Sequence, residues 1–166
     1  MSPAGVSGSA SGGQLEEKID LSAETNAKIK ESESLAQAGN LQEALALLAA
    51  LEKKCRVGND NPSLIRVCKS SLELCHQVGD RDALLSTLKT LSTRRSQKSS
   101  AVRTLVQTAL PWCVSEPYSP IEVTNEKEKE ERDTLVNTLR DITDGKIFLE
   151  RERAQLTRAL ASIQER

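Results

Sequence analysis

The sequence predicts an all-α fold built from stacked antiparallel helical hairpins. The chain is rich in Leu, Ala, Glu, Lys, Arg and Gln, which favour helices, and aromatic residues make up only 2% of it. Apolar residues recur at helical spacing along most of the length, and no segment alternates with a period of two for long enough to form a strand. A β-sandwich would also need more β-branched and aromatic residues.

Residues 1–20 are expected to be a disordered tail rich in Ser and Gly, and residues 21–166 a helical-repeat domain. Glycines, prolines and capping residues divide this domain into seven expected helices. These cover Ala23 to Ala38, the Asn40 cap to Gly58, Asn61-Pro62 to Gly79, the Asp80 cap through Leu91, about Gln97 to Pro111, about Asn125 to Thr143, and the residues beyond Gly145. Glu116–Thr124 contains two prolines and is expected to be a loop.

The clearest helix begins at Asn40, where Glu43 stands in the position that a capping box requires.

An internal repeat supports the prediction of stacked helical hairpins. Residues 37–45 resemble residues 77–85 at an offset of about 40 residues, the period of a stacked helix pair. Gly39 matches Gly79, and Leu45 and Leu48 match Leu85 and Leu88, so these four leucines are expected to be core residues. Each hairpin leaves an apolar face that a neighbouring hairpin must cover, so the repeat predicts a right-handed superhelix of the TPR-like α-solenoid type.

Histidine and cysteine offer the only candidates for a metal site. His76 follows Cys75, and Cys55 and Cys68 fall on apolar faces of the expected helices. Neighbouring residues point about 100° apart on a helix, so Cys75 and His76 cannot converge on one ion or act as a catalytic pair. Structural zinc needs four ligands, which favours reduced thiols in the core. No phosphate-binding, dinucleotide-binding or hydrolase motif is present, so we expect no catalytic residue, cofactor or metal.

A basic cluster lies at the turn between the fourth and fifth expected helices. It comprises Arg94, Arg95, Lys98 and Arg103. The first interpretation is solvated surface charge, because cations near a helix C-terminus interact favourably with the helix dipole. A contact with an acidic protein surface is the second interpretation and a contact with nucleic acid the third, because no aromatic residue stands nearby in the sequence to stack on a base.

The charge and hydropathy pattern excludes other classes of protein. The formal net charge is −1, and acidic and basic residues are interspersed, which is unlike a dedicated nucleic-acid-binding or membrane-surface protein. No apolar run is long enough to span a bilayer, and the N-terminus has no signal-peptide pattern. The interpretation is therefore a protein of the cytoplasm and nucleus that binds other proteins and has no small-molecule substrate.

Several strings in order along the chain resemble the PCI-family subunits of the 26S proteasome lid. Thr90–Gln97 is similar to a family stretch with two arginines before Ser-Gln, and Leu139–Glu150 is similar to a stretch that contains Gly-Lys-Ile. Residues 152–158, 41–44 and 51–53 continue the match. The resemblance extends from about Leu35 to the end and includes no catalytic motif.

The resemblance implies N-terminal helical repeats followed by a winged-helix PCI module, which would make this chain the N-terminal fragment of a longer protein. It also implies a scaffold role in lid assembly and ubiquitin-dependent proteolysis. The implied partners are other lid subunits, the ATPase ring and the core particle. A PCI subunit of the COP9 signalosome type is the alternative, and an RNA-associated helical repeat is a more distant one.

Overall fold

The structure is a computed structural model that describes residues 18–115 and 119–164. The described α-helices are α2 (Ser22–Gln37), α3 (Leu41–Val57), α4 (Asn61–Val78), α5 (Arg81–Ser92), α6 (Ser99–Ala109), α7 (Glu126–Thr143) and α8 (Glu150–Gln164). Short 3₁₀ turns stand at Leu110–Trp112 and Ile147–Leu149, and the two-residue strands β1 (Val114–Ser115) and β2 (Ser119–Pro120) form the only sheet of this part of the chain.

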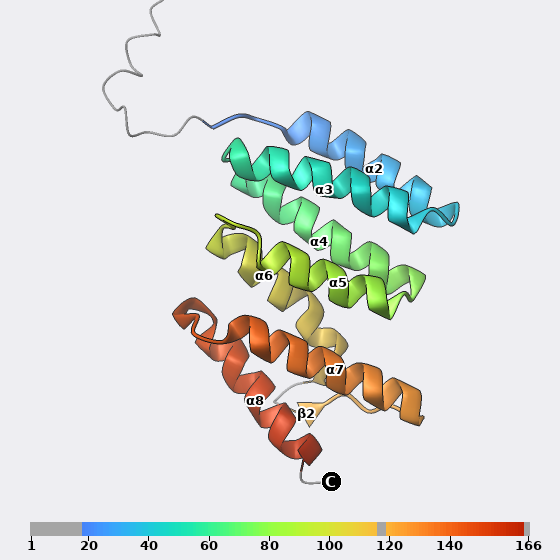
Figure 1. Cartoon of the computed structure of the whole chain (residues 1–166), viewed down its shortest axis with the longest axis vertical. Helices are drawn as coiled ribbons and strands as arrows, with labels where there is room; N and C mark the ends of the chain where they lie inside the picture. Colours follow the sequence, from blue (N-terminus) through green and yellow to red (C-terminus); the bar gives the residue numbers. More distant parts are fainter. Residues whose placement is uncertain (1–17, 116–118, 165–166) are drawn as a thin grey trace, which may run out of the picture.

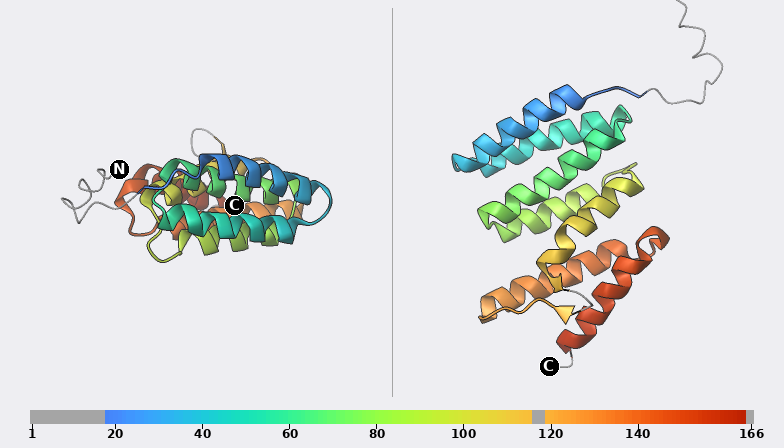
Figure 2. Two further views of the ribbon diagram at one scale, coloured as in Figure 1. Left: turned by 90° about the horizontal axis from the view of Figure 1, so that it is seen from above. Right: turned by 180° about the vertical axis from the view of Figure 1, so that it is seen from behind.

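The helices stack as successive antiparallel hairpins in two layers. In Figure 1, α3, α5 and α7 lie nearer the viewer, and α2, α4 and α6 lie behind them, while the second view of Figure 2 shows the reverse. Helix α4 packs against both α2 and α6 in the rear layer, and α5 packs against α7 in the front layer. The all-α helical-repeat prediction is confirmed. The superhelical sense of the stack stays a prediction.

Aliphatic side chains between the two layers form one continuous core. The largest fully buried apolar side chains are leucines that come from every helix from α3 to α8 and from the turn before α8: Leu48, Leu64, Leu72, Leu84, Leu88, Leu105, Leu135, Leu139, Leu149 and Leu156. The repeat-equivalent residues Leu48 and Leu88 are both 0% exposed. Leu45 and Leu85, expected to be equally buried, are only partly buried and pack against the edge of the core.

Left-handed glycines make the two repeat-related turns possible. Gly39 has φ 88° between α2 and α3, and Gly79 has φ 84° between α4 and α5. Few residues other than glycine adopt this conformation without steric cost. The helix C-termini at these positions were correctly predicted, because a helix that ends on a left-handed residue needs glycine there.

Two of the predicted helix caps are corrected by the structure. Asn40 precedes α3, but its side chain makes no capping hydrogen bond, so the capping box with Glu43 does not form. Helix α4 is capped one residue earlier than expected, by Asp60, whose carboxylate accepts from the backbone N–H of Ser63 at 3.2 Å. The second oxygen of Asp60 accepts from the N–H of Leu21 at 2.7 Å, which ties the start of α2 to the start of α4.

The chain between α6 and α7 departs from the prediction of a strand-free fold. Pro111 ends α6 as expected, and a 3₁₀ turn then leads into β1, which pairs antiparallel with β2. The buried guanidinium of Arg132 on α7 donates to the carbonyl of Ile121 at 2.9 Å and to the carboxylate of Asp133 at 2.8 Å. This contact holds the end of the connection against α7, which a two-residue ladder could not do alone.

The predicted tail, residues 1–20, lies mostly outside the described residues. Of its last three residues, Ile19 donates its backbone N–H to the carbonyl of Gly58 at 2.9 Å, beside the turn between α3 and α4. Among the helices of residues 18–115 and 119–164, none combines the length and the apolar character needed to cross a bilayer.

Candidate protein-binding loop

The loop between α5 and α6 carries three of the four predicted binding residues. It starts after Ser92, where α5 ends, and Ser96 within it adopts a left-handed conformation with φ 64°. Lys98 stands at the N-cap position of α6 without a capping side-chain hydrogen bond. The backbone N–H of Gln97 donates to the carbonyl of Arg94 at 3.1 Å and closes a tight turn around Ser96, so the arginines precede this turn and Lys98 follows it.

A buried carboxylate on α3 holds this loop. Glu52 is 0% exposed and accepts from Arg56 Nε at 2.9 Å and from Gln97 Nε2 at 3.1 Å. Its other carboxylate oxygen lies 3.5 Å from Arg94 Nε. A buried carboxylate is costly unless cations and hydrogen-bond donors surround it. Here Arg56 and Gln97 donate to Oε2, while Oε1 has the ion pair with Arg94 but no hydrogen bond. The loop is thus joined to the preceding hairpin.

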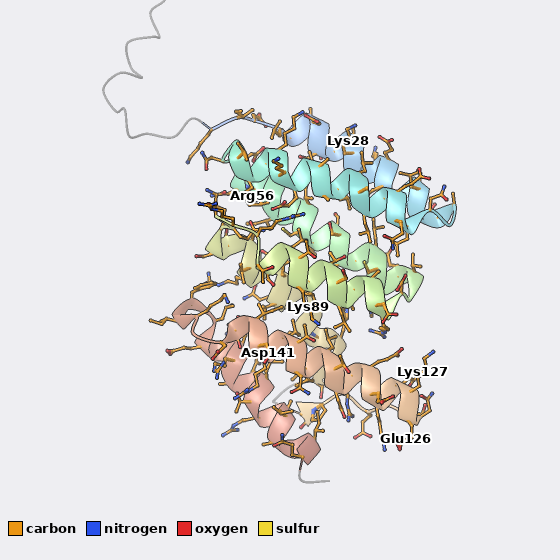
Figure 3. All side chains as sticks on the ribbon, in the orientation of Figure 1. Lys28, Arg56, Lys89, Glu126, Lys127 and Asp141 are labelled. Atoms are coloured by element: carbon orange, nitrogen blue, oxygen red, sulfur yellow. The ribbon has the colours of Figure 1, made fainter. Side chains whose placement is uncertain are left out.

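Three further hydrogen bonds fix the shape of the loop. Arg56 donates to the backbone carbonyl of Arg95 at 3.1 Å, and Gln97 donates to the carbonyl of Leu91 at 2.8 Å. Lys98 Nζ donates to the Asn59 side chain at 2.9 Å, in the turn between α3 and α4. Figure 3 shows Arg56 on the side of the stack where the α3–α4 turn and this loop lie. The loop therefore has contacts on both of its arms.

Arg103, the fourth predicted residue, does not join the other three. It lies within α6 and donates to the carbonyl of Phe148 at 3.1 Å, with its guanidinium 5.6 Å from the centre of the Phe148 ring. The predicted cluster is thus two separate groups, because Arg103, one turn into α6, contacts Phe148 in the turn before α8 rather than Glu52 on α3. Arg103 connects the middle of the stack to the turn before α8.

Sequence reasoning missed Glu52 and Gln97 as members of this site. A signal for Glu52 was present, because it stands four residues after Leu48 and three before Cys55, on the apolar stripe of α3. A charged residue on such a stripe indicates a buried partner. No comparable local signal marks Gln97, whose partner lies 45 residues away in the sequence.

The cysteines occupy the core, as predicted for Cys55, Cys68 and Cys75. All four, including Cys113, are free thiols and buried. Burial raises the pKa of the Cys68 and Cys113 thiols to about 12. The thiolate is the form that binds metal and attacks electrophiles, so these thiols are poor ligands and poor nucleophiles at neutral pH.

His76 packs against an aromatic ring rather than against a cysteine. Its ring lies 3.9 Å from the ring of Trp112, with an interplanar angle of 7°. Burial lowers the pKa of His76, and the positive charge of Arg81 lowers it further. Within the described part of the chain, no three His, Cys, Asp or Glu side chains are placed to hold a metal ion. The absence of metal and of catalysis stays a prediction.

Comparison with known proteins places this arrangement of helices in a family. Residues 43–166 match the family described as "PSMD12/CSN4, N-terminal", from the first turn of α3 to the last residue of the chain. The chain belongs to this family. The family resemblance inferred from the sequence strings is confirmed.

Individual members of the family are similar to most of the chain. The 26S proteasome non-ATPase regulatory subunit 12 of Dictyostelium discoideum is 38% identical over 146 residues, which cover 88% of this chain and 30% of that protein. Its homolog A in Arabidopsis thaliana is 30% identical over 131 residues, with coverages of 79% and 27%. The 26S proteasome regulatory subunit RPN5 of Saccharomyces cerevisiae is 29% identical, with coverages of 80% and 28%. The chain thus spans about 30% of the length of the curated relatives it matches.

Proposed function

We propose that the protein is a non-catalytic scaffold subunit of the 26S proteasome regulatory particle lid, acting in ubiquitin-dependent protein degradation in the cytoplasm and nucleus. The similarity of most of the chain to proteasome regulatory subunits carries this proposal. The fold supports it, because a stack of hairpins offers an extended surface to several partners at once. The partners proposed are other lid subunits and, beyond them, the ATPase ring and the core particle.

Within this function, Arg94, Arg95, Lys98 and Arg103 are proposed as protein-contacting residues. The loop that holds the first three is fixed by hydrogen bonds before any partner arrives. A preformed loop loses less conformational freedom on binding than a flexible one does. Cations on such a loop favour an acidic protein surface.

The alternative is a scaffold of the COP9 signalosome type, because the family description names CSN4 beside PSMD12. The relatives described above are named as proteasome subunits, which favours the proteasome. An RNA-associated role is the least supported by the charge pattern. The net charge is −1, and tracking a phosphate backbone would require a strongly basic surface.

The test is to tag the full-length protein at its own gene and purify it under native conditions with ATP. The expected result is co-elution with the lid subunits in equal amounts, together with ATP-dependent degradation of a ubiquitinated substrate. Co-elution with signalosome subunits alone would establish the alternative. Elution as a free protein, or in a complex that nuclease dissolves, would overturn the scaffold proposal.

A further inference from the structure

The α5–α6 loop uses most of its cationic side chains for internal contacts. Arg94 faces the buried carboxylate of Glu52, and Lys98 contacts Asn59. Arg95 differs from them. Its backbone carbonyl accepts from Arg56, while its side chain is exposed and forms no hydrogen bond or ion pair with any described residue. The contacts on either side of it direct one guanidinium group outward.

The electrostatics around this group favour an anionic partner. One buried carboxylate, Glu52, is shared between the guanidinium groups of Arg56 and Arg94. Two positive charges against one negative charge leave an excess of positive charge beside Arg95. An exposed guanidinium in such a field attracts carboxylates over a range of about 8 Å at physiological ionic strength. Its planar pair of N–H donors then suits a carboxylate bound through both oxygens.

A protein carboxylate fits the loop better than a nucleic acid does. Proteins that bind single strands combine cations with aromatic rings on which the bases stack. The described aromatic rings are occupied elsewhere, since Trp112 stacks on His76 and Phe148 lies under Arg103. The loop therefore has charge without a stacking platform.

We propose that Arg95 is the residue through which this loop recognises an acidic surface on a neighbouring protein subunit, and that buried Glu52 is the positioning residue that sets its direction. The proposal rests on the proposed scaffold function, since it requires a neighbouring subunit. Glu52 acts through Arg56 and Gln97, which hold the loop on both sides of Ser96. This narrows the contact proposed above for the loop: Arg95 is its exposed contact residue, and Glu52, Arg56 and Gln97 hold it in place.

The test uses full-length protein added to lid particles depleted of the corresponding subunit, with the rate of incorporation measured at low and at high salt. Arg95→Glu is expected to slow incorporation roughly tenfold at low salt, and the difference from the wild type should shrink at high salt. Lys28→Glu is the matched control, because it makes the same charge change on α2, away from the loop (Figure 3). The control should incorporate at the wild-type rate.

Glu52→Gln separates positioning from simple attraction. It removes a negative charge next to Arg95, so if only charge matters, incorporation should become faster. If the loop must be held in place, incorporation should become slower although the charge is more favourable. Should Glu52→Gln fail to fold, Gln97→Ala removes a contact from the same carboxylate without a charge change, and slower incorporation is again expected.

The outcomes distinguish the two proposals. Failure of the wild-type protein to enter the depleted lid would overturn the scaffold function itself. Entry of the wild type together with unimpaired entry of Arg95→Glu would overturn only the role of Arg95. Faster entry of Glu52→Gln would refute the positioning role. Loss of the Arg95 effect after nuclease treatment would show that the loop binds nucleic acid instead.

Discussion

Residues 37–52 and 77–92 carry the same hairpin turn, and the two copies can be compared position by position. Their glycines have nearly the same left-handed conformation, φ 88° at Gly39 and φ 84° at Gly79. Their central leucines are equally buried. The polar residues differ. Asp80 caps its helix by accepting from Ala83 at 2.9 Å, whereas Asn40 makes no such bond, and the place of Glu52 is taken in the second copy by Ser92.

The comparison distinguishes the features that hairpin stacking requires from the polar contacts that differ between the two copies. A hairpin needs a turn that reverses the chain and an apolar stripe that meets its neighbour, so these features repeat. Caps and buried charges depend on the elements that lie beside each copy. Glu52 stands where the α5–α6 loop can reach it, and Ser92 stands at the end of α5 beside that loop. Substitutions at matched positions can test this separation.

The largest effects are expected at the matched leucines. Leu48→Ala and Leu88→Ala should each lower the free energy of unfolding by about 2–5 kcal/mol, because each removes a fully buried side chain from the core. Urea denaturation of both variants measures the cost. Leu45→Ala and Leu85→Ala are the controls and should cost less, since both side chains are only partly buried. A large cost in one copy and none in the other would contradict the equivalence of the two hairpins.

A difference between the copies is expected at the next pair. Glu52→Ala should cost about 2 kcal/mol, because it leaves Arg56 and Gln97 without their charged acceptor. Ser92→Ala should stay within about 0.5 kcal/mol, as expected for a surface position. Thermal unfolding followed by circular dichroism compares them. Equal costs would mean that the Glu52 network adds nothing to stability.

The glycines should again behave alike. Gly39→Ala and Gly79→Ala are each expected to cost about 1–2 kcal/mol from backbone strain alone, because a Cβ at either position would meet no atom within 4 Å. The same denaturation experiment measures both variants. A cost at one glycine more than twice that at the other would show that the two turns are held differently.

The smallest contrast concerns the caps. Asp80→Ala should cost about 1 kcal/mol, since it deprives the N–H of Ala83 of its acceptor. Asn40→Ala should cost only a few tenths of a kcal/mol, since that side chain caps nothing. Equal destabilisation by the two substitutions would show that Asn40 does form a cap in solution.

The fold was largely predictable because its signals are local. Glycine and proline mark the helix ends, and apolar residues at helical spacing mark the buried faces. The errors arose where a distant contact decides the outcome. Asp60 and Asn61 are both good caps by type, and the structure selects Asp60, which also accepts from the N–H of Leu21. The pairing of β1 with β2 joins strands of only two residues, which leave no periodicity in the sequence.

The candidate site was only partly predictable for the same reason. Arg94, Arg95 and Lys98 could be found from their charge and their place between two helices. Their arrangement depends on Glu52, more than 40 residues earlier in the chain. Arg103 is close to them in sequence, but its partner, Phe148, follows 45 residues later. The four residues were therefore grouped because they are close in sequence, although Arg103 has a different partner in the folded stack from the other three.

The stacked pair of His76 and Trp112 provides an intrinsic fluorescence probe. The chain contains one tryptophan and one histidine, and their rings are in contact between the end of α4 and the turn after α6. Tryptophan fluorescence of the chain thus originates from a single inter-hairpin junction.

The protonation of His76 links this junction to pH. Because burial lowers the pKa of His76, its imidazole becomes protonated at a lower pH in the folded chain than in the unfolded chain. The contribution of the neutral ring to stability is therefore present above the unfolded pKa and declines as the pH falls from there toward the folded pKa. A fluorescence titration can follow the protonation of this one junction, while circular dichroism reports on the helices of the whole stack.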